Sequence, residues 1–257
     1  MMRVVHVLAA AILLTACSST DDATPDGGAP RDDAGTKDAT LDVDLPDTGT
    51  DAGLDAGDAD AAPDASSCPK TLLVGGVDVI PQGWSIVSLN DFELSYAGDS
   101  TVLKTSTKSG ARQGGELLLS YPGAYEAGKP FRLQVVMRVD SVGQHNQADS
   151  AAAILGSFTG PIPAPDQRSQ MLYLDAAEIG WADNSNRFAT SVVDNAYHTY
   201  ELSVDAANVA RVSVDGAATP LTRSNIVTNG TIAIGDQTND PNVDAVTRIR
   251  SVTRLCP

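Results

Sequence analysis

The sequence predicts an all-β domain in residues 68–257, folded as an antiparallel β-sandwich, and two observations carry this prediction. Apolar and polar side chains alternate with a period of two, which is typical of strands that bury one face and expose the other. Turn-forming residues separate the alternating segments, and no segment shows the 3.6-residue repeat of a long amphipathic helix. About a dozen short strands in a segment of this length favour two packed antiparallel sheets.

The alternation is clearest in three segments. In 131–139, one face carries Phe, Leu, Val, Met and Val, and the other face is mostly polar. Segment 199–204 places Tyr, Leu and Val on one face, and segment 209–214 repeats the pattern with Ala, Val and Val. Turns are expected where Asn, Asp, Ala and Gly gather, at 206–208, 215–216, 229–230 and 235–236.

Residues 1–16 have the pattern of a secretion signal. Arg3 precedes an apolar run of eleven residues from Val4 to Leu14. A membrane-spanning helix needs about 20 apolar residues, so the run is too short to remain as a span.

The four residues Leu14-Thr15-Ala16-Cys17 resemble the lipobox of bacterial lipoproteins. The resemblance implies that the signal is removed before Cys17, whose thiol and new amino group are then lipidated. Two or three acyl chains would anchor the chain firmly in a membrane. Ser18 follows the cysteine, which in that family favours the outer membrane. The alternative is an ordinary signal with a cleavage site near Ala16 and an unmodified cysteine.

Most of the negative charge lies between the lipidation site and the domain. Residues 18–67 carry a net charge of −12, whereas residues 68–257 carry only −5. The segment 17–67 is rich in Asp, Ala, Gly and Pro and has no aromatic residue, so we expect a disordered tether. A calcium-binding repeat is the alternative, but the Asp spacing is irregular. Nucleic acid is excluded as a partner because the chain lacks a basic stripe.

Cys68 and Cys256 bracket the predicted domain, and Cys17 is the only other cysteine. Export places them in an oxidising compartment, so a disulfide between them is expected. The bond would hold the two ends of the domain side by side. Two free thiols are the alternative.

Several segments resemble concanavalin A-like lectin/glucanase domains, including laminin-G-like modules. The resemblance rests on the hairpin formed by 197–205 and 210–216, on the strand-like segment 230–236 that follows, and on 249–255 as the final strand. It implies a jelly-roll sandwich over most of residues 70–256, with the final strand near the first.

No catalytic pattern is present. Glucanases of this family place two carboxylates on one strand face, about 5–5.5 Å apart in retaining enzymes. None of the glutamates of the domain lies in such a pattern; they are Glu93, Glu116, Glu126, Glu178 and Glu201. Zinc-site and nucleophile-elbow motifs are missing as well. We therefore expect a protein that is not an enzyme.

One polar segment is the first candidate for ligand binding. Residues 180–187 combine an aromatic ring with amide and charged groups, the mixture that sugar recognition uses. The alternative is that the tryptophan fills the core and the polar run is a hairpin tip. His145 in a second polar loop is a further candidate, although a plain surface loop would look the same. The candidate ligand-binding residues are Trp181, Asn184, Asn186, Arg187 and His145.

Residues 235–244 are a candidate calcium loop, since calcium prefers oxygen ligands. The expected ligands are Asp236, Asn239, Asp240 and Asp244, with an ordinary polar turn as the alternative. In the last predicted strand, Arg248, Arg250 and Arg254 are expected on one face. Cross-strand pairing with acids or an anionic-glycan patch would explain them.

The function expected from these observations is a lipoprotein anchored in the envelope membrane, at the outer membrane or cell surface. Its sandwich would bind carbohydrate, with calcium as a potential cofactor. Two alternatives stay open: an adhesion or structural lipoprotein that binds another envelope protein, and a divergent glycan-degrading enzyme.

Overall fold

The computed structural model describes residues 68–105, 115–146, 154–161 and 166–257. These segments form fifteen strands and one short 3-10 helix, η1 (Arg168–Gln170). The predicted signal (1–16), the predicted lipidation site Cys17 and the predicted tether (17–67) lie outside the described residues. Among the described residues, no helix has the length and apolar character needed to cross a membrane.

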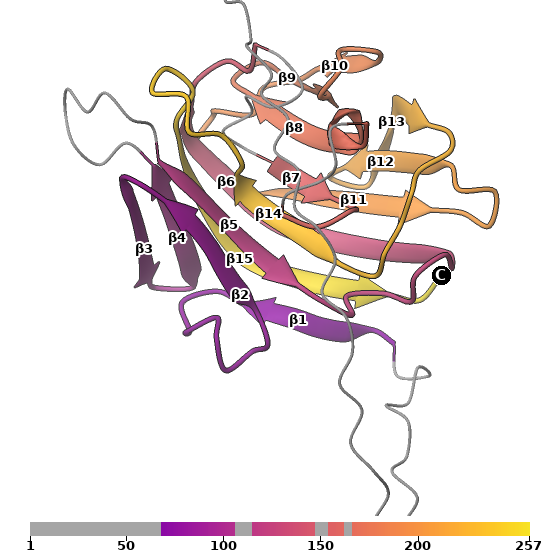
Figure 1. The fold of residues 1–257 in the computed structure, drawn as a ribbon, viewed down its shortest axis with the longest axis horizontal. Helices are drawn as coiled ribbons and strands as arrows, with labels where there is room; N and C mark the ends of the chain where they lie inside the picture. The colour runs from indigo at the N-terminus through magenta and orange to yellow at the C-terminus, as the bar shows by residue number, and fades with distance from the viewer. Residues whose placement is uncertain (1–67, 106–114, 147–153, 162–165) are drawn as a thin grey trace, which may run out of the picture. The chain divides into compact units, whose positions relative to one another are not determined.

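The strands form two antiparallel sheets, which lie as stacked layers (Figure 1). The eight-stranded sheet has the spatial order β13 (Ala217–Arg223), β12 (Ala210–Val214), β11 (His198–Val204), β6 (Phe131–Val142), β15 (Ala245–Leu255), β4 (Ser100–Thr105) and β3 (Phe92–Ala97), with β1 (Lys70–Val74) also paired to β15. The seven-stranded sheet has the order β10 (Arg187–Ala189), β9 (Glu178–Trp181), β8 (Met171–Asp175), β7 (Ile154–Ser157), β14 (Ile232–Asp236), β5 (Glu116–Tyr121) and β2 (Ser85–Leu89). The predicted all-β antiparallel sandwich is confirmed.

One hydrophobic core fills the space between the sheets. In β6, Leu133, Val135 and Met137 are fully buried, and the residues between them are half-exposed. The same alternation in β11 and β12 places Leu202 and Val212 in this core. The three segments with the clearest sequence alternation are interior strands of the larger sheet, each paired on both sides.

The two ends of the domain lie side by side. β1 pairs antiparallel with β15, and Lys70 is opposite Arg254. A disulfide joins Cys68 to Cys256, whose Cα atoms are 5.2 Å apart. Both the disulfide and the proximity of the first and last strands are confirmed.

The three arginines of β15 do not share one face, and this expectation was wrong for Arg254. The pairing of β15 with β6 shifts register between Ile249 and Ser251. A one-residue shift moves every later side chain to the opposite face. Arg254 consequently lies opposite Leu133, a core residue, and lines a cavity beside Cys68.

The turn expected at 235–236 is also wrong, since both residues end β14 and are buried. Gly235 has a φ of 133°, and a Cβ there would lie 2.2 Å from the carbonyl oxygen of Leu117 on β5. Glycine is needed at this position because the backbones of β14 and β5 approach closely, and not because the chain turns.

Candidate functional site

A buried polar cluster lies at the β8–β9 hairpin of the smaller sheet. Leu172 and Leu174 of β8 point into the main core, so Tyr173 and Asp175 point to the opposite face. Gly180 lies opposite Tyr173 on β9, and a Cβ at this glycine would be 2.6 Å from the tyrosine hydroxyl oxygen. The absence of a side chain on Gly180 therefore makes room for the Tyr173 ring.

His145 reaches this face from the segment that follows β6. Its loop passes close to another loop: the Gly143 amide donates to the Asp244 carbonyl oxygen at 2.7 Å, and a Cβ on Gly143 would be 2.8 Å from the Asn242 carbonyl oxygen. The Asn146 side-chain amide donates to Asp240 at 3.3 Å. These contacts place His145 over β8.

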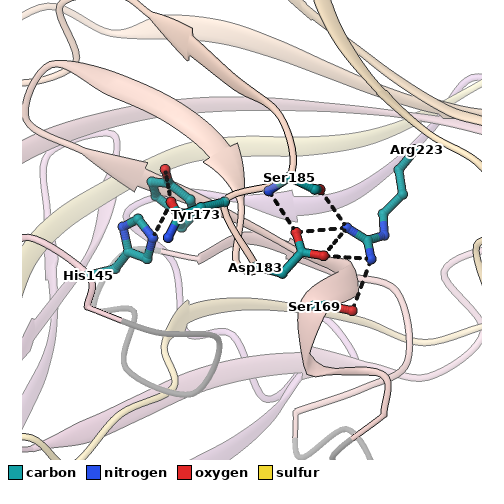
Figure 2. A network of polar contacts seen from close by, with 7 residues as sticks. His145, Ser169, Tyr173, Asp183, Ser185 and Arg223 are labelled. Atoms are coloured by element: carbon teal, nitrogen blue, oxygen red, sulfur yellow. Dashed lines mark hydrogen bonds and ion pairs between the residues drawn. The ribbon is translucent and has the colours of Figure 1, made fainter.

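Both sides of the buried His145 ring are held by polar atoms, and Figure 2 shows the ring beside Tyr173. Its Nδ1 atom lies 2.8 Å from Oδ2 of Asp175, whose Oδ1 atom also accepts the backbone amide of His145 at 3.1 Å. Its Nε2 atom lies 3.0 Å from Oδ1 of Asn184. The imidazole packs against the Tyr173 ring, with ring centroids 3.6 Å apart and the ring planes inclined by 33°. The ring orientation is thus fixed from three directions.

Glu178 completes the cluster. The Tyr173 hydroxyl donates to Oε1 of Glu178 at 2.8 Å, and Nη1 of Arg187 lies 3.6 Å from the same oxygen. Burial, and next the neighbouring Glu178 carboxylate, raise the pKa of Tyr173. The hydroxyl therefore stays protonated, which suits it as a donor and makes it a poor general base.

A cavity of about 250 Å³ opens beside this cluster. Its apolar walls come from valine and alanine side chains, and its polar groups come from an amide and two carboxylates. The lining residues are Val142, Gln144, Asp175, Ala176, Ala177 and Glu178. The Glu178 side chain is 25% exposed and the Asp175 side chain only 7%, so Glu178 is the carboxylate presented to solvent.

The structure brings together three of the five predicted ligand-binding residues: His145 contacts Asn184, and Arg187 reaches the same cluster through Glu178. Asn184 lies in the tight turn between β9 and β10 with a φ of 58°, a conformation that asparagine tolerates. This turn aims its side chain at His145.

Trp181 does not offer a ring face to a ligand, because its side chain is fully buried in the main core. Strand alternation is the reason: Gly180 and Glu178 face the polar cluster, so Trp181 faces the opposite way. The side-chain amide of Asn186 donates to the Pro220 carbonyl oxygen at 3.1 Å and ties the hairpin to β13. The hairpin-tip interpretation of 180–187 is therefore correct for these two residues.

The candidate calcium loop does not gather its carboxylates. Asp236 is buried, and its oxygens accept hydrogen bonds from Oγ1 of Thr105 at 2.6 Å and from the Thr238 amide at 2.9 Å. Asp240 accepts hydrogen bonds from Asn242 and Asn146. In the described segments, the predicted ligands Asp236, Asp240 and Asp244 do not form a set of three within ligand distance of one another. Asp236 faces the interior, where the Asp244 and Glu116 carboxylates act on it, and the calcium prediction for residues 235–244 stays a prediction.

Two of the β15 arginines pair with acids. Nε of Arg248 lies 2.6 Å from Asp140, and Nε of Arg250 lies 2.7 Å from Asp99. Arg250 also stacks on the Tyr197 ring at 3.9 Å from its centroid. Cross-strand pairing accounts for this face, and the anionic-glycan patch gains no support.

Tyr173, Asp175 and Glu178 were not among the residues selected from the sequence. β8 reads Met-Leu-Tyr-Leu-Asp and is buried on both faces, so no alternation separated its outer side chains from the core. The signal that existed was Asp175-Ala176-Ala177-Glu178, two acids across a short turn between two apolar runs.

No protein-family model matches the chain, and no curated protein matches it in sequence. Solved structures similar to it include the Emp47p carbohydrate recognition domain, with 14% identity, a TM-score of 0.41, and coverage of 67% of this chain and 88% of that one. An endo-1,3-β-glucanase from Streptomyces sioyaensis has 14% identity and a TM-score of 0.43, covering 77% and 100%. The calcium-bound exoplasmic domain of VIP36 has 10% identity and a TM-score of 0.43, covering 68% and 83%. At these identities the likeness concerns fold alone.

Proposed function

We propose that the chain is a lipoprotein, anchored through Cys17 in the outer membrane, that presents a non-catalytic carbohydrate-binding sandwich. The observation that carries the binding proposal is the cavity at the β8–β9 hairpin. Sugar sites combine apolar walls with a few planar polar groups that fix the hydroxyls, and this cavity has both. Its volume of about 250 Å³ suits one sugar ring at the end of a glycan.

The roles of the lining groups follow from their chemistry. Glu178 accepts hydrogen bonds from sugar hydroxyls, because its carboxylate is partly exposed and acceptor-only when ionised. Gln144 both donates and accepts. Ala176 and Ala177 supply a flat apolar wall for the C–H face of the ring.

A glycan-degrading enzyme is the second candidate, because Asp175 and Glu178 place carboxylate oxygens within 4.8 Å of each other. Hydrolysis needs both carboxylates at the scissile bond. Asp175 is buried, its Oδ1 accepts the backbone amide of His145, and its Oδ2 lies 2.8 Å from Nδ1 of the same residue. This arrangement favours binding over catalysis.

A glycan array probed with the full chain tests the proposal. We expect binding to a defined group of terminal sugars, and at least tenfold weaker binding for Glu178→Gln and Gln144→Ala. Glu201→Gln, on the larger sheet, is the matched control and should bind normally. No response to any glycan, including those of the producing cell, would refute the proposal. Release of reducing ends by the wild type would establish the enzyme instead.

The membrane anchor is tested separately. Cells fed with radiolabelled palmitate should label the wild-type chain and not the Cys17→Ala variant, which should leave the membrane fraction. Membrane fractionation then distinguishes the outer from the inner membrane. Equal labelling of the two chains would exclude Cys17 as the lipid site.

A further inference from the structure

The two ring nitrogens of His145 pose a chemical problem. Nδ1 faces a carboxylate oxygen of Asp175, and Nε2 faces the side-chain oxygen of Asn184. A neutral imidazole has one N–H group, so it can donate to only one of these two acceptors. A second proton on the ring, the reversed orientation of the Asn184 amide, or a cation at one ring nitrogen would satisfy the other contact.

We infer that the His145 cluster is a binding site for a divalent transition-metal ion of the zinc type, with His145, Asp175 and Glu178 as ligands. A ring nitrogen of His145 and one oxygen from each carboxylate all lie within 4.8 Å of one another. Of the described residues, these three alone form such a group of histidine, cysteine or acidic side chains.

The metal removes the conflict at the ring. With the ion bound by Nδ1, the imidazole is neutral and its Nε2–H donates to Asn184. Ligating histidines commonly give their second N–H to a carbonyl or carboxylate group that fixes the ring orientation. Asn184 takes this role here, and Tyr173 fixes Glu178 through its hydroxyl.

The charges of the cluster also fit a divalent cation. Two carboxylates lie together where Asp175 is buried and Glu178 is three-quarters buried. Burying carboxylates is costly unless positive charge compensates them. Arg187, at 3.6 Å from Glu178, is more than half exposed and compensates only in part. One divalent ion would balance both acids.

The ligand set selects the type of metal. Calcium takes oxygen ligands, whereas an imidazole with carboxylates suits zinc. Zinc bonds of about 2.0–2.2 Å require ligand atoms no more than about 4.4 Å apart. The three ligand atoms lie within 4.8 Å of one another, so the ion would draw them closer together on binding. The neighbouring cavity gives the ion an entry path and leaves room for a further ligand.

Zinc titration of the full chain, purified without a polyhistidine tag and stripped with a chelator, tests the site without any glycan. We expect one equivalent to bind by calorimetry and to raise the thermal unfolding midpoint. His145→Gln and Glu178→Gln should each lower the affinity at least 100-fold. Asn184→Gly keeps the left-handed backbone and should weaken binding about 10–100-fold, as removal of outer-shell partners does.

His198→Gln is the matched control. His198 also lies between two acids, Asp194 and Asp215, but these contact opposite sides of its ring and cannot share one ion with it. This variant should bind zinc like the wild type. All variants keep the acidic residues 18–67, so weak zinc binding to those residues would be the same in every variant and would not affect the comparison. Circular dichroism shows whether each variant folds, and Glu178→Gln keeps the test valid if His145→Gln unfolds. Absence of saturable binding, or equal binding by the wild type and Glu178→Gln, would overturn the inference.

Discussion

Arg223 on β13 donates hydrogen bonds to both carboxylate oxygens of Asp183, in the turn after β9, at 3.0–3.1 Å. The same guanidinium group donates to Ser185 and Ser169 (Figure 2). β13 belongs to the larger sheet and β9 to the smaller one. This ion pair therefore joins the two sheets at one edge and holds the turn that presents Asn184 to His145.

We predict that Arg223→Gln lowers the free energy of unfolding by about 1–2 kcal/mol, the range for charge-assisted hydrogen bonds discounted for partial exposure. Urea unfolding of Arg223→Gln, Asp183→Asn and the double variant measures the coupling between the two side chains. Arg187→Gln is the control, because that side chain is 54% exposed and makes one long contact. Additive effects of the two single substitutions would show that the pair does not couple.

The same substitution should act on the metal site. Loosening the turn of residues 182–185 removes the support of Asn184, so Arg223→Gln should weaken zinc binding about tenfold, as loss of an outer-shell contact does. Competition with a chromogenic chelator measures this effect. Unchanged zinc affinity would show that Asn184 is held without Arg223.

His198 gives a pH-dependent contribution to stability. Burial alone lowers its pKa, but hydrogen bonds to Asp215 at 2.7 Å and Asp194 at 3.1 Å outweigh burial and raise the pKa. A raised folded-state pKa means that the contribution is fully present below the unfolded pKa of about 6.5. It is lost as pH rises through the folded-state pKa.

We therefore predict that the stability difference between the wild type and His198→Gln, at most about 1 kcal/mol for such a pair, shrinks as pH rises from 6 to 9. Urea unfolding across that range measures it, and the variant corrects for every other group that titrates. A difference that grows with pH would contradict the raised pKa.

The strands predicted best from the sequence are those with one solvent-exposed face. β6, β11 and β12 alternate because their outer side chains, such as Arg132 and Glu201, meet solvent and each other at 2.8 Å. β8 carries no such pattern because both of its faces are buried, the second under His145. Hydrophobic periodicity reflects solvent exposure. It therefore cannot distinguish a strand face that packs in the core from a strand face that is covered by a polar site.

Only the loop residues of the candidate site were predicted from the sequence, for a related reason. Polar residues in loops, such as His145 and Asn184, are visible in the sequence because they interrupt the strands. Their partners Asp175 and Tyr173 lie within a strand, and only the chain path brings them into contact. The bulge that moves Arg254 to the inner face is likewise invisible, because it depends on the pairing of β15 with β6.

Loss of the disulfide between Cys68 and Cys256 should cost about 2–5 kcal/mol of stability, because the bond closes almost the whole domain into one loop. We expect the double variant Cys68→Ser/Cys256→Ser to unfold at a lower temperature than the wild type. A reductant should lower the thermal unfolding midpoint of the wild type to that of the variant, and it should leave the midpoint of the variant unchanged. A midpoint insensitive to both changes would show that the pairing of β1 with β15 alone holds the ends together.

Because Trp181 is buried, we predict that it behaves as a core residue and not as a residue that stacks on a sugar. The chain has two tryptophans, and both Trp84 and Trp181 are buried. Native fluorescence should be blue-shifted, resistant to acrylamide and unchanged by bound glycan. Trp181→Phe leaves a void in the core and should cost about 1–3 kcal/mol, less than the about 3–5 kcal/mol of a truncation to alanine.

Glycan affinity should survive Trp181→Phe, because the ring points away from the cavity lined by Gln144 and Glu178. Gln144→Ala is the reciprocal control, since it should weaken glycan binding and leave stability within about 0.5 kcal/mol. If Trp181→Phe instead abolished glycan binding while the protein stayed folded, the ligand would contact the tryptophan. The binding site would then lie between the sheets, since the indole is enclosed there by the core residues Phe158 and Leu172.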